Sequence, residues 1–168
     1  MGLDNAGKTT LLAMLQNDRF TQTDSTIHPH QAEVVIGNIQ FNSYDLGGHA
    51  QARKTWSEYA GTVDGIIFMV DAADRNRLEE SKNELEGLLK MPELQTVPFV
   101  IFGNKIDKPG AVKEEELREI FGLHYHSTYG KDPNQKNQGN RPIEIFMCSI
   151  LKRVGYADGF EWLSRFIK

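Results

Sequence analysis

The amino-acid sequence predicts an α/β fold, with a doubly wound, mostly parallel sheet and helices on both faces. Three observations support this prediction. The segment Gly2-Leu3-Asp4-Asn5-Ala6-Gly7-Lys8-Thr9 fits the phosphate-binding pattern G-x-x-x-x-G-K-[ST] and leads into helix-favouring residues. Two short apolar runs, 65–70 and 99–103, are typical of parallel strands covered on both faces. Between them, leucines at positions 78, 85, 88 and 89 have the spacing of an amphipathic helix.

Composition limits the classes of protein to be considered. A chain of 168 residues is one domain with room for a real core, so we expect a single domain over 1–168. The net charge of −4 argues against non-specific nucleic-acid binding, which needs a basic face. Cys148 is the only cysteine, which excludes an intramolecular disulfide. It is best explained as a small apolar side chain within a strand. No apolar run is long enough to span a membrane, and there is no secretory signal.

The phosphate-binding pattern is the first candidate site. Its glycines allow backbone N–H groups to turn toward a phosphate, and the following helix presents its N-terminus to the anion. Lys8 would bring a positive charge to the β- and γ-phosphates, and the Thr9 hydroxyl could bind Mg²⁺. The plain alternative is a glycine-containing turn that caps a helix. The candidate residues are Asp4, Asn5, Ala6, Gly7, Lys8, Thr9 and Thr10.

A phosphate loop of this kind joins the carboxyl end of a strand to a helix. Only Met1 precedes Gly2 here, so we expect that strand to lie upstream and the sequence to be N-terminally truncated. The alternative is that another segment, or another molecule, fills the place. Because such a strand is central in a doubly wound sheet, its neighbours would otherwise keep unpaired backbone groups.

The polar stretch 17–31 predicts a loop. Within it, the Thr26 hydroxyl could reach Mg²⁺ while its N–H meets a γ-phosphate. Taken alone, a threonine in a polar loop is better explained by solvent exposure.

Two strand-like runs, 32–36 and 39–44, are separated by Gly37-Asn38, which indicates a hairpin. The second run ends in Asp45-Leu46-Gly47-Gly48-His49. Asp45 would face the ligand edge of the sheet and could hold Mg²⁺ through water. The glycines would let a backbone N–H, that of Gly48, approach a γ-phosphate. The alternative is an ordinary turn after a strand.

The segment from Ala50 to Tyr59 is expected to be helical. Its Trp56 suits either a partner contact or internal packing, and the sequence does not decide between them. The arginines Arg75 and Arg77, with the glutamates that follow, are expected to form the solvated face of the next helix.

The apolar run 99–103 leads into Asn104-Lys105-Ile106-Asp107 and then a predicted helix over 114–121. The Asp107 carboxylate could accept N1–H and the 2-amino group of guanine, which adenine does not offer. Asn104 would brace the neighbouring loops, and the Lys105 stem would cover the base plane. A polar strand-to-helix turn is the alternative.

The polar stretch of about 124–141 predicts a surface loop, and its two histidines make a poor metal site. A strand over 143–148 and a helix over 157–166 complete the fold, with Trp162 in packing. Just past the last strand, backbone N–H groups could meet the guanine O6. These candidates are Ser149, Ile150 and Leu151.

The order of these motifs is that of a GTP-binding domain, and the chain resembles a Sar-type small GTPase of the Arf/Sar family along its whole length. The resemblance is carried by residues 2–10, Thr26-Ile27-His28-Pro29, Tyr44-Asp45-Leu46-Gly47-Gly48-His49, Asn104-Lys105-Ile106-Asp107 and 146–156. It implies the P-loop NTPase fold of a small GTPase G domain. The related Arf group has Gln where this chain has His49, which favours the Sar type.

The resemblance also implies a function. The chain would bind GTP or GDP with Mg²⁺ held by Thr9, Thr26 and Asp45, with Asp4 near the metal, and His49 would orient the attacking water. It would recruit the COPII coat for budding from the endoplasmic reticulum to the Golgi. Its partners would be inner COPII coat subunits, one of them a GTPase-activating protein, and a membrane-bound exchange factor. Location would be cytoplasmic, peripheral on the endoplasmic reticulum and Golgi, through an N-terminal amphipathic helix that this sequence does not include.

Three other interpretations remain. An Arf-like trafficking GTPase acting on other effectors would share nearly all of this chemistry. An ATP-using P-loop enzyme would not need Asn-Lys-x-Asp. A nucleotide-binding module without turnover is the third.

Overall fold

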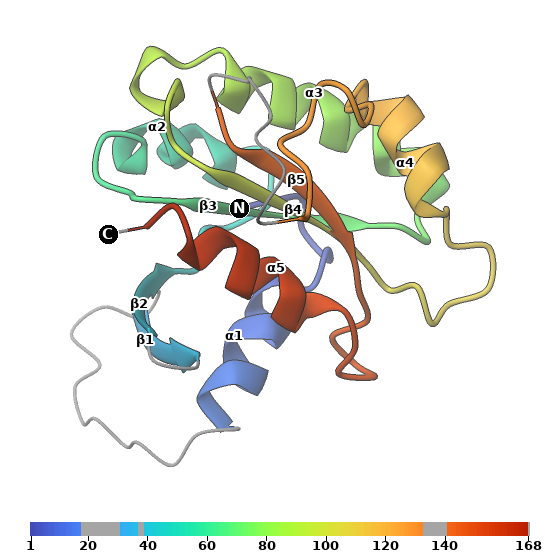
Figure 1. The fold of residues 1–168 in the computed structure, drawn as a ribbon, viewed down its shortest axis with the longest axis horizontal. Helices are drawn as coiled ribbons and strands as arrows, with labels where there is room; N and C mark the ends of the chain where they lie inside the picture. The colour runs from blue at the N-terminus through green and yellow to red at the C-terminus, as the bar shows by residue number, and fades with distance from the viewer. Residues whose placement is uncertain (18–30, 37–38, 133–140, 168) are drawn as a thin grey trace.

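The computed structural model describes residues 1–17, 31–36, 39–132 and 141–167. Its centre is a parallel sheet with the order β3–β4–β5 (Figure 1). The strands are β3 (Ile66–Asp71), β4 (Phe99–Asn104) and β5 (Ile143–Met147). Every residue of β4 is buried, as expected of a strand with neighbours on both sides and helices on both faces. The two apolar runs of the sequence are therefore the strands that they predict.

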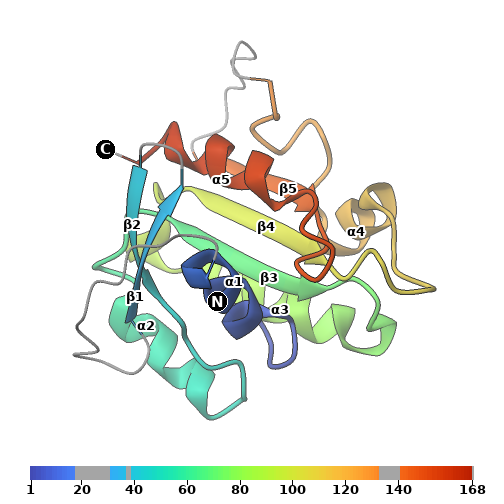
Figure 2. The same ribbon diagram turned by 90° about the horizontal axis from the view of Figure 1, so that it is seen from below.

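Helices cover both faces of this sheet (Figures 1 and 2). On one face lie α1 (Lys8–Asn17) and α5 (Tyr156–Ser164). On the other lie α2 (Trp56–Tyr59), α3 (Leu78–Leu89) and α4 (Glu114–Phe121). Short 3₁₀ turns, η1 (Ala52–Thr55), η2 (Arg75–Arg77) and η3 (Pro92–Leu94), complete the connections. The doubly wound arrangement is confirmed.

Each face has its own apolar core. Leu85 and Leu88 of α3 and Leu117 of α4 pack on one side. Leu11 of α1 and Phe160 of α5 pack on the other. Full burial of side chains of this size contributes roughly 1.5–3 kcal/mol each, so the two cores hold the helices against the sheet and fix the loops at its carboxyl edge.

The predicted hairpin is present as β1 (Gln31–Ile36) and β2 (Ile39–Tyr44), which pair antiparallel. Among the described residues this hairpin is a sheet of its own, because no ladder joins β2 to β3 there. A groove of about 390 Å³ lies between β2 and β3. Its lining includes Phe41, Tyr44, Ile67 and Leu163.

Met1 and Gly2, the first residue of the phosphate loop, run alongside β3. The Met1 amino group donates to the Ile67 carbonyl over 2.7 Å, and Met69 N–H donates to the Met1 carbonyl over 2.9 Å. Gly2 forms a parallel bridge with Met69. The phosphate loop therefore starts at the carboxyl edge of the sheet. The chain enters it parallel to β3, as it would from a preceding parallel strand.

Both tryptophans are buried. Trp56 is 2% exposed, meets Phe68 edge to face and donates its ring N–H to the Gly47 carbonyl over 3.0 Å. It is therefore a packing residue, and its use as a partner contact is excluded in this conformation. Trp162 also packs, as predicted, and donates to the Gly130 carbonyl over 2.8 Å.

The predicted surface loop of 124–141 is exposed at 124–127, and residues 133–140 lie outside the described part of the chain. The rings of His124 and His126 stack with centroids 5.6 Å apart. Beneath this loop, Arg118 forms a buried ion pair with Glu144, which ties α4 to β5. Among the described residues, no helix is both long and apolar enough to cross a membrane.

Candidate functional site

The phosphate loop has the backbone that its glycines permit. Gly2 and Gly7 have φ angles of 126° and 106°. A Cβ on Gly2 would lie 2.2 Å from the Met69 carbonyl oxygen, and one on Gly7 would lie 2.4 Å from Nδ2 of Asn104. Both positions therefore require glycine for steric as well as conformational reasons. Asn5, with φ 62°, is in the left-handed region that asparagine tolerates.

Lys8 is the first residue of α1, and its side chain crosses the loop. The ammonium donates to the Leu3 carbonyl over 2.8 Å. Burial lowers the pKa of Lys8, while Asp45 and Asp4 act in the opposite direction. An ammonium has three donors, so the group held in this way keeps donors for an anion in the loop.

Thr9 and Asp45 meet at the mouth of the loop. The Thr9 hydroxyl donates to Oδ2 of Asp45 over 2.6 Å, although the two residues are 36 positions apart. A hydroxyl beside a carboxylate is the hard oxygen donor set that Mg²⁺ prefers, and Mg²⁺ typically takes few protein ligands and keeps several waters. The residues present therefore fit this ion. Thr26, the other candidate ligand, lies outside the described residues.

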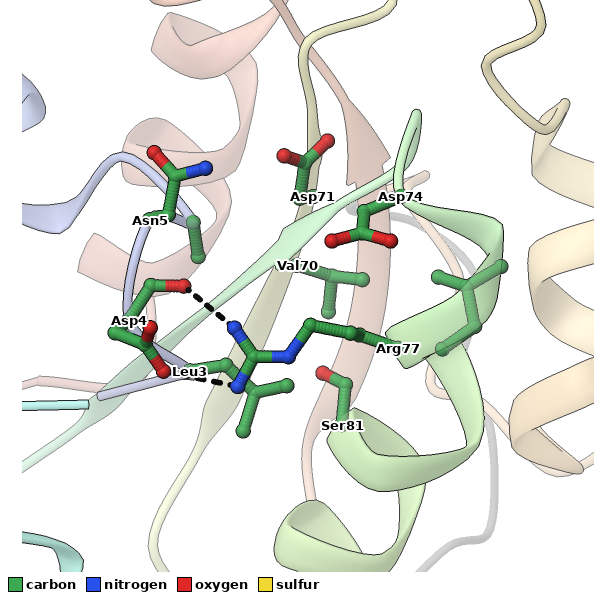
Figure 3. Close-up of a pocket in the computed structure, with 10 residues that line it drawn as sticks. Leu3, Asp4, Asn5, Val70, Asp71, Asp74, Arg77 and Ser81 are labelled. Carbon is green, nitrogen blue, oxygen red and sulfur yellow. Dashed lines mark hydrogen bonds and ion pairs between the residues drawn. The ribbon is translucent and has the colours of Figure 1, made fainter. Parts of the chain in front are cut away.

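The Asp4 side chain, expected near the metal, bonds an arginine from across the site. Its carboxylate accepts a hydrogen bond from Nη2 of Arg77 over 2.9 Å (Figure 3), and this bond lowers the pKa of Asp4. Arg77 was expected on the solvated face of α3, and that expectation is wrong because its guanidinium reaches the phosphate loop.

The Gly47–Gly48 turn lies directly against the loop. A Cβ on Gly48 would be 2.1 Å from the Asp4 nitrogen, so only glycine fits there. Nε of Arg53 donates to the Gly48 carbonyl over 2.7 Å. The His49 side chain is exposed, and its carbonyl accepts the Arg53 N–H over 2.9 Å.

Asn104 joins the base-recognition motif to the phosphate loop. Its side chain is 3% exposed, donates to the Ala6 carbonyl over 2.9 Å and accepts the Ile150 N–H over 3.0 Å. Lys105, with φ 70°, donates to the Asn5 carbonyl over 2.6 Å and pairs with Asp71 at the same distance. Three loops are thereby held as one unit.

Asp107 is held by the residue after β5. The Ser149 hydroxyl donates to its carboxylate over 2.5 Å, and this bond lowers the pKa of Asp107. The carboxylate therefore stays ionised and acceptor-only at neutral pH. The N–H groups of Ser149 and Ile150 are used within the protein, by the Val154 carbonyl and Asn104, which leaves Leu151 as the remaining candidate donor to a base.

The structure thus brings the described candidate residues together at the carboxyl ends of β2, β3, β4 and β5. Sequence reasoning missed three charged residues there: Arg53, Asp71 and Arg77. Asp71 ends a strand at the ligand edge, which was an available signal. The two arginines gave none, because Asp4, which Arg77 bonds, and Glu80 and Glu84, which Arg53 bonds, are distant from them in sequence.

With this geometry established, comparison with known proteins is decisive. The profile of the ADP-ribosylation factor family matches residues 1–167. The chain belongs to this family. Members of the ADP-ribosylation factor family are small GTPases, so the chain is a guanine-nucleotide-binding enzyme that hydrolyses GTP.

Individual relatives refine the family assignment. The small COPII coat GTPase SAR1 of Giardia intestinalis is 46% identical, over 99% of this chain and 87% of that protein. Its namesake in Nicotiana tabacum is 39% identical, over 100% and 87%. ADP-ribosylation factor-like protein 1 of Drosophila melanogaster is 36% identical, over 98% and 84%. The resemblance to Sar-type GTPases is confirmed.

A solved structure has the same fold. The Arl6 BBS3 small GTPase of Trypanosoma brucei, with the bound nucleotide analogue GppNp, superposes with a TM-score of 0.77 at 31% identity. The match covers 98% of this chain and 92% of that one. The small-GTPase fold predicted from the sequence is confirmed.

Proposed function

We propose that this chain is a GTP-dependent switch that recruits the COPII coat for vesicle budding from the endoplasmic reticulum to the Golgi. Residues 1–168 would form its single G domain. The specific role is supported by the names of the SAR1 relatives, which are up to 46% identical, and by His49 directly after Gly47-Gly48.

The observation that carries the nucleotide site is the position of Asn104. One buried amide bonds both the phosphate loop, at Ala6, and the turn after β5, at Ile150. Base and phosphate recognition are therefore mechanically joined. In this site Asp107 would accept the two guanine donors, Lys105 would cover the base, and the Leu151 N–H would meet O6.

The phosphate groups would be bound by the backbone amides of residues 4–10 and by Lys8. Thr9 and Asp45 fit Mg²⁺, and Thr26 and Asp4 are the further proposed members of its surroundings. The ion, when bound, would neutralise charge that develops on the β- and γ-phosphates. These groups act by holding the phosphates in place, since phosphoryl transfer needs positioning and charge stabilisation more than covalent chemistry.

Hydrolysis would depend on His49 and Gly48. The neutral imidazole of His49 would accept a hydrogen bond from the attacking water, and Gly48 N–H would meet the γ-phosphate. The arginines nearest the turn have other partners: Arg53 bonds Glu80 and Glu84, and Arg77 bonds Asp4 and Glu80. Unassisted turnover should therefore be slow, and an arginine from a partner would raise it by about 10³–10⁵-fold.

The proposed partners are an inner COPII coat subunit, acting as GTPase-activating protein, and a membrane-bound exchange factor. The proposed location is the cytosolic face of the endoplasmic reticulum and the Golgi. An Arf-like GTPase with other effectors is the second candidate, which the 36% identity to a factor-like protein favours. A module that binds nucleotide without turnover is the third.

Binding to purified coat subunits tests this role. The chain is loaded with GDP or a non-hydrolysable GTP analogue and mixed with the inner COPII subunits or with an Arf-type coat. Capture of the COPII subunits by the triphosphate form alone is the expected result. Capture of only the Arf-type coat would replace the proposal with the second candidate, and absence of phosphate release with any activating partner would favour the third.

A further inference from the structure

Arg77 connects the phosphate loop to α3. It is the last residue of η2, and its side chain is 32% exposed. Nη2 donates to the Asp4 carboxylate over 2.9 Å, and Nη1 donates to the Asp4 carbonyl over 3.4 Å (Figure 3). One planar guanidinium thereby holds both the side chain and the backbone of a residue in the loop, a geometry that lysine cannot reproduce.

A series of charged side chains continues from Arg77. Nε of Arg77 donates to Glu80 over 2.8 Å, and the other oxygen of Glu80 accepts Nη2 of Arg53 over 2.6 Å. Arg53, whose side chain is 9% exposed, also donates to Glu84 over 2.7 Å and ends the series at the Gly48 carbonyl. We call Asp4, Arg77, Glu80, Arg53 and Gly48 the charged relay.

The two ends of the charged relay touch one another. Gly48 lies against the Leu3–Asp4 backbone so closely that a methyl group would overlap it. The carbonyl that Arg53 holds belongs to the peptide between Gly48 and His49. The phosphate loop and the Gly47–Gly48 turn are therefore held together in two ways: by direct contact, and through the arginines that bond the glutamates of α3.

The charges of the relay alternate in sign. Hydrogen bonds from Arg77, and then from Arg53, lower the pKa of Glu80 to about 2. Glu80 is therefore an anion at every pH at which the protein would work, and the two arginines share it. The Arg53 side chain is 9% exposed, so its ion pairs are better shielded from solvent than those of a surface arginine.

We propose that Arg77 and Arg53 are positioning residues that couple the phosphate loop to the Gly48–His49 peptide, so that the site distinguishes a triphosphate from a diphosphate. This inference rests on the proposed roles of Gly48 and His49. Asp4 lies in the loop that would hold both nucleotides. Gly48, whose carbonyl Arg53 holds, would meet only the γ-phosphate, through its N–H. A relay between them strengthens triphosphate binding more than diphosphate binding, as coupling between two sites requires.

Dissociation rates of fluorescent GDP and of a fluorescent non-hydrolysable GTP analogue test the proposal. The variants are Arg77→Ala, Arg53→Ala and their double variant. In each single variant, the dissociation rate of the triphosphate should rise about fivefold more than that of GDP. This is a coupling at the low end of the usual range. The double variant should show little more than either single variant, because both break the same relay.

Arg75→Ala is the matched control. Arg75 lies in the same turn and pairs with Glu116, but its side chain is 53% exposed and contacts α4 rather than the loop. Its two rates should equal those of the parent chain. Glu80→Gln keeps the side-chain volume and weakens both ion pairs, so it should reproduce the selective effect if an arginine variant fails to fold.

Two results would overturn the proposal. Equal acceleration of both nucleotides, accompanied by a lower Tm, would mean that the arginines serve stability alone. Additive effects in the double variant would mean that two separate interactions exist rather than one relay. Failure of the proposed function is distinguishable, because the parent chain itself would then bind neither guanine nucleotide.

Discussion

The hydroxyl of Thr9 donates a hydrogen bond of 2.6 Å to the carboxylate of Asp45, which joins the start of α1 to the end of the hairpin. This bond brings together, at the mouth of the phosphate loop, the two oxygen groups that we propose as ligands of Mg²⁺. The pair is therefore the part of the site on which metal binding should depend.

Thr9→Ala should weaken Mg²⁺-dependent nucleotide binding by about 10–100-fold, since loss of a metal-orienting group has effects of that size. Titration of GDP binding at several Mg²⁺ concentrations measures it. Thr62→Ala is the control, because the Thr62 hydroxyl caps a distant turn at the Tyr59 carbonyl. If Thr9→Ala weakened binding equally in excess chelator, Thr9 would have no role at the metal.

Asp107→Asn should lower the affinity for GDP by about 100-fold and favour xanthosine diphosphate. The amide offers a donor where guanine needs a second acceptor, whereas xanthine carries an oxygen at that position. Competition between the two nucleotides measures the preference, and Asp158→Asn on the exposed start of α5 is the control. An unchanged preference for GDP would remove Asp107 from base recognition.

His49→Gly should keep nucleotide affinity and lose stimulated hydrolysis, by about 10²–10⁴-fold, which is the contribution of a group that handles the reacting water. Phosphate release with and without the activating coat subunit measures this. His126→Gly, in the exposed loop after α4, should leave both rates unchanged. Unaltered stimulated turnover in His49→Gly would exclude His49 from the mechanism.

Glu80 predicts a pH dependence of stability. Its pKa in the folded chain is about 2, below the ordinary value of 4.5, because Arg77 and Arg53 donate to it. Its contribution is therefore complete above pH 4.5 and is lost as the pH falls toward 2. The advantage in unfolding free energy over Glu80→Gln should shrink between pH 6 and pH 3. Glu79→Gln, at an exposed position paired with Lys82, should show no such trend.

Cys148 should resist alkylation in the folded chain. Burial raises the pKa of its thiol to about 12, so the reactive thiolate is absent at pH 8. Its sulfur lies 3.8 Å from the Asn104 side-chain oxygen, behind the base-recognition motif. A thiol reagent should react slowly with the native chain and rapidly in urea. Fast, stoichiometric reaction without denaturant would show that this region opens readily.

Much of the fold could be predicted because its signals are local. The helix of 114–121 has the predicted bounds. The strand β4 extends one residue beyond its predicted end, and β3 is displaced by one residue at both ends. The spacing of Gly2, Gly7, Lys8 and Thr9 predicts the position of the phosphate loop directly, because it brings the turn, the positive charge and the hydroxyl together. Asn104 could be assigned a bracing role because it follows a buried strand at the ligand edge.

What the sequence concealed depends on distant contacts. Arg77 and Asp4 are 73 positions apart, so nothing in the helical pattern of α3 indicates that the arginine directly before this helix faces the phosphate loop. The burial of Trp56 likewise follows from Phe68 and the Gly47 carbonyl, which meet it only in the folded chain. The groove between β2 and β3 exists because these two strands do not pair, and periodicity does not report which strands pair.

The most direct test of the account is the identity of the nucleotide released when the purified chain is denatured. Chromatography of the supernatant should give GDP or GTP at about one per chain, if Asp107 selects guanine and the phosphate loop retains the nucleotide as proposed. Release of ADP or ATP would contradict the base-recognition assignment. A chain that releases nothing, and also fails to bind added GDP with Mg²⁺, would contradict the central claim that this site is a working guanine-nucleotide switch.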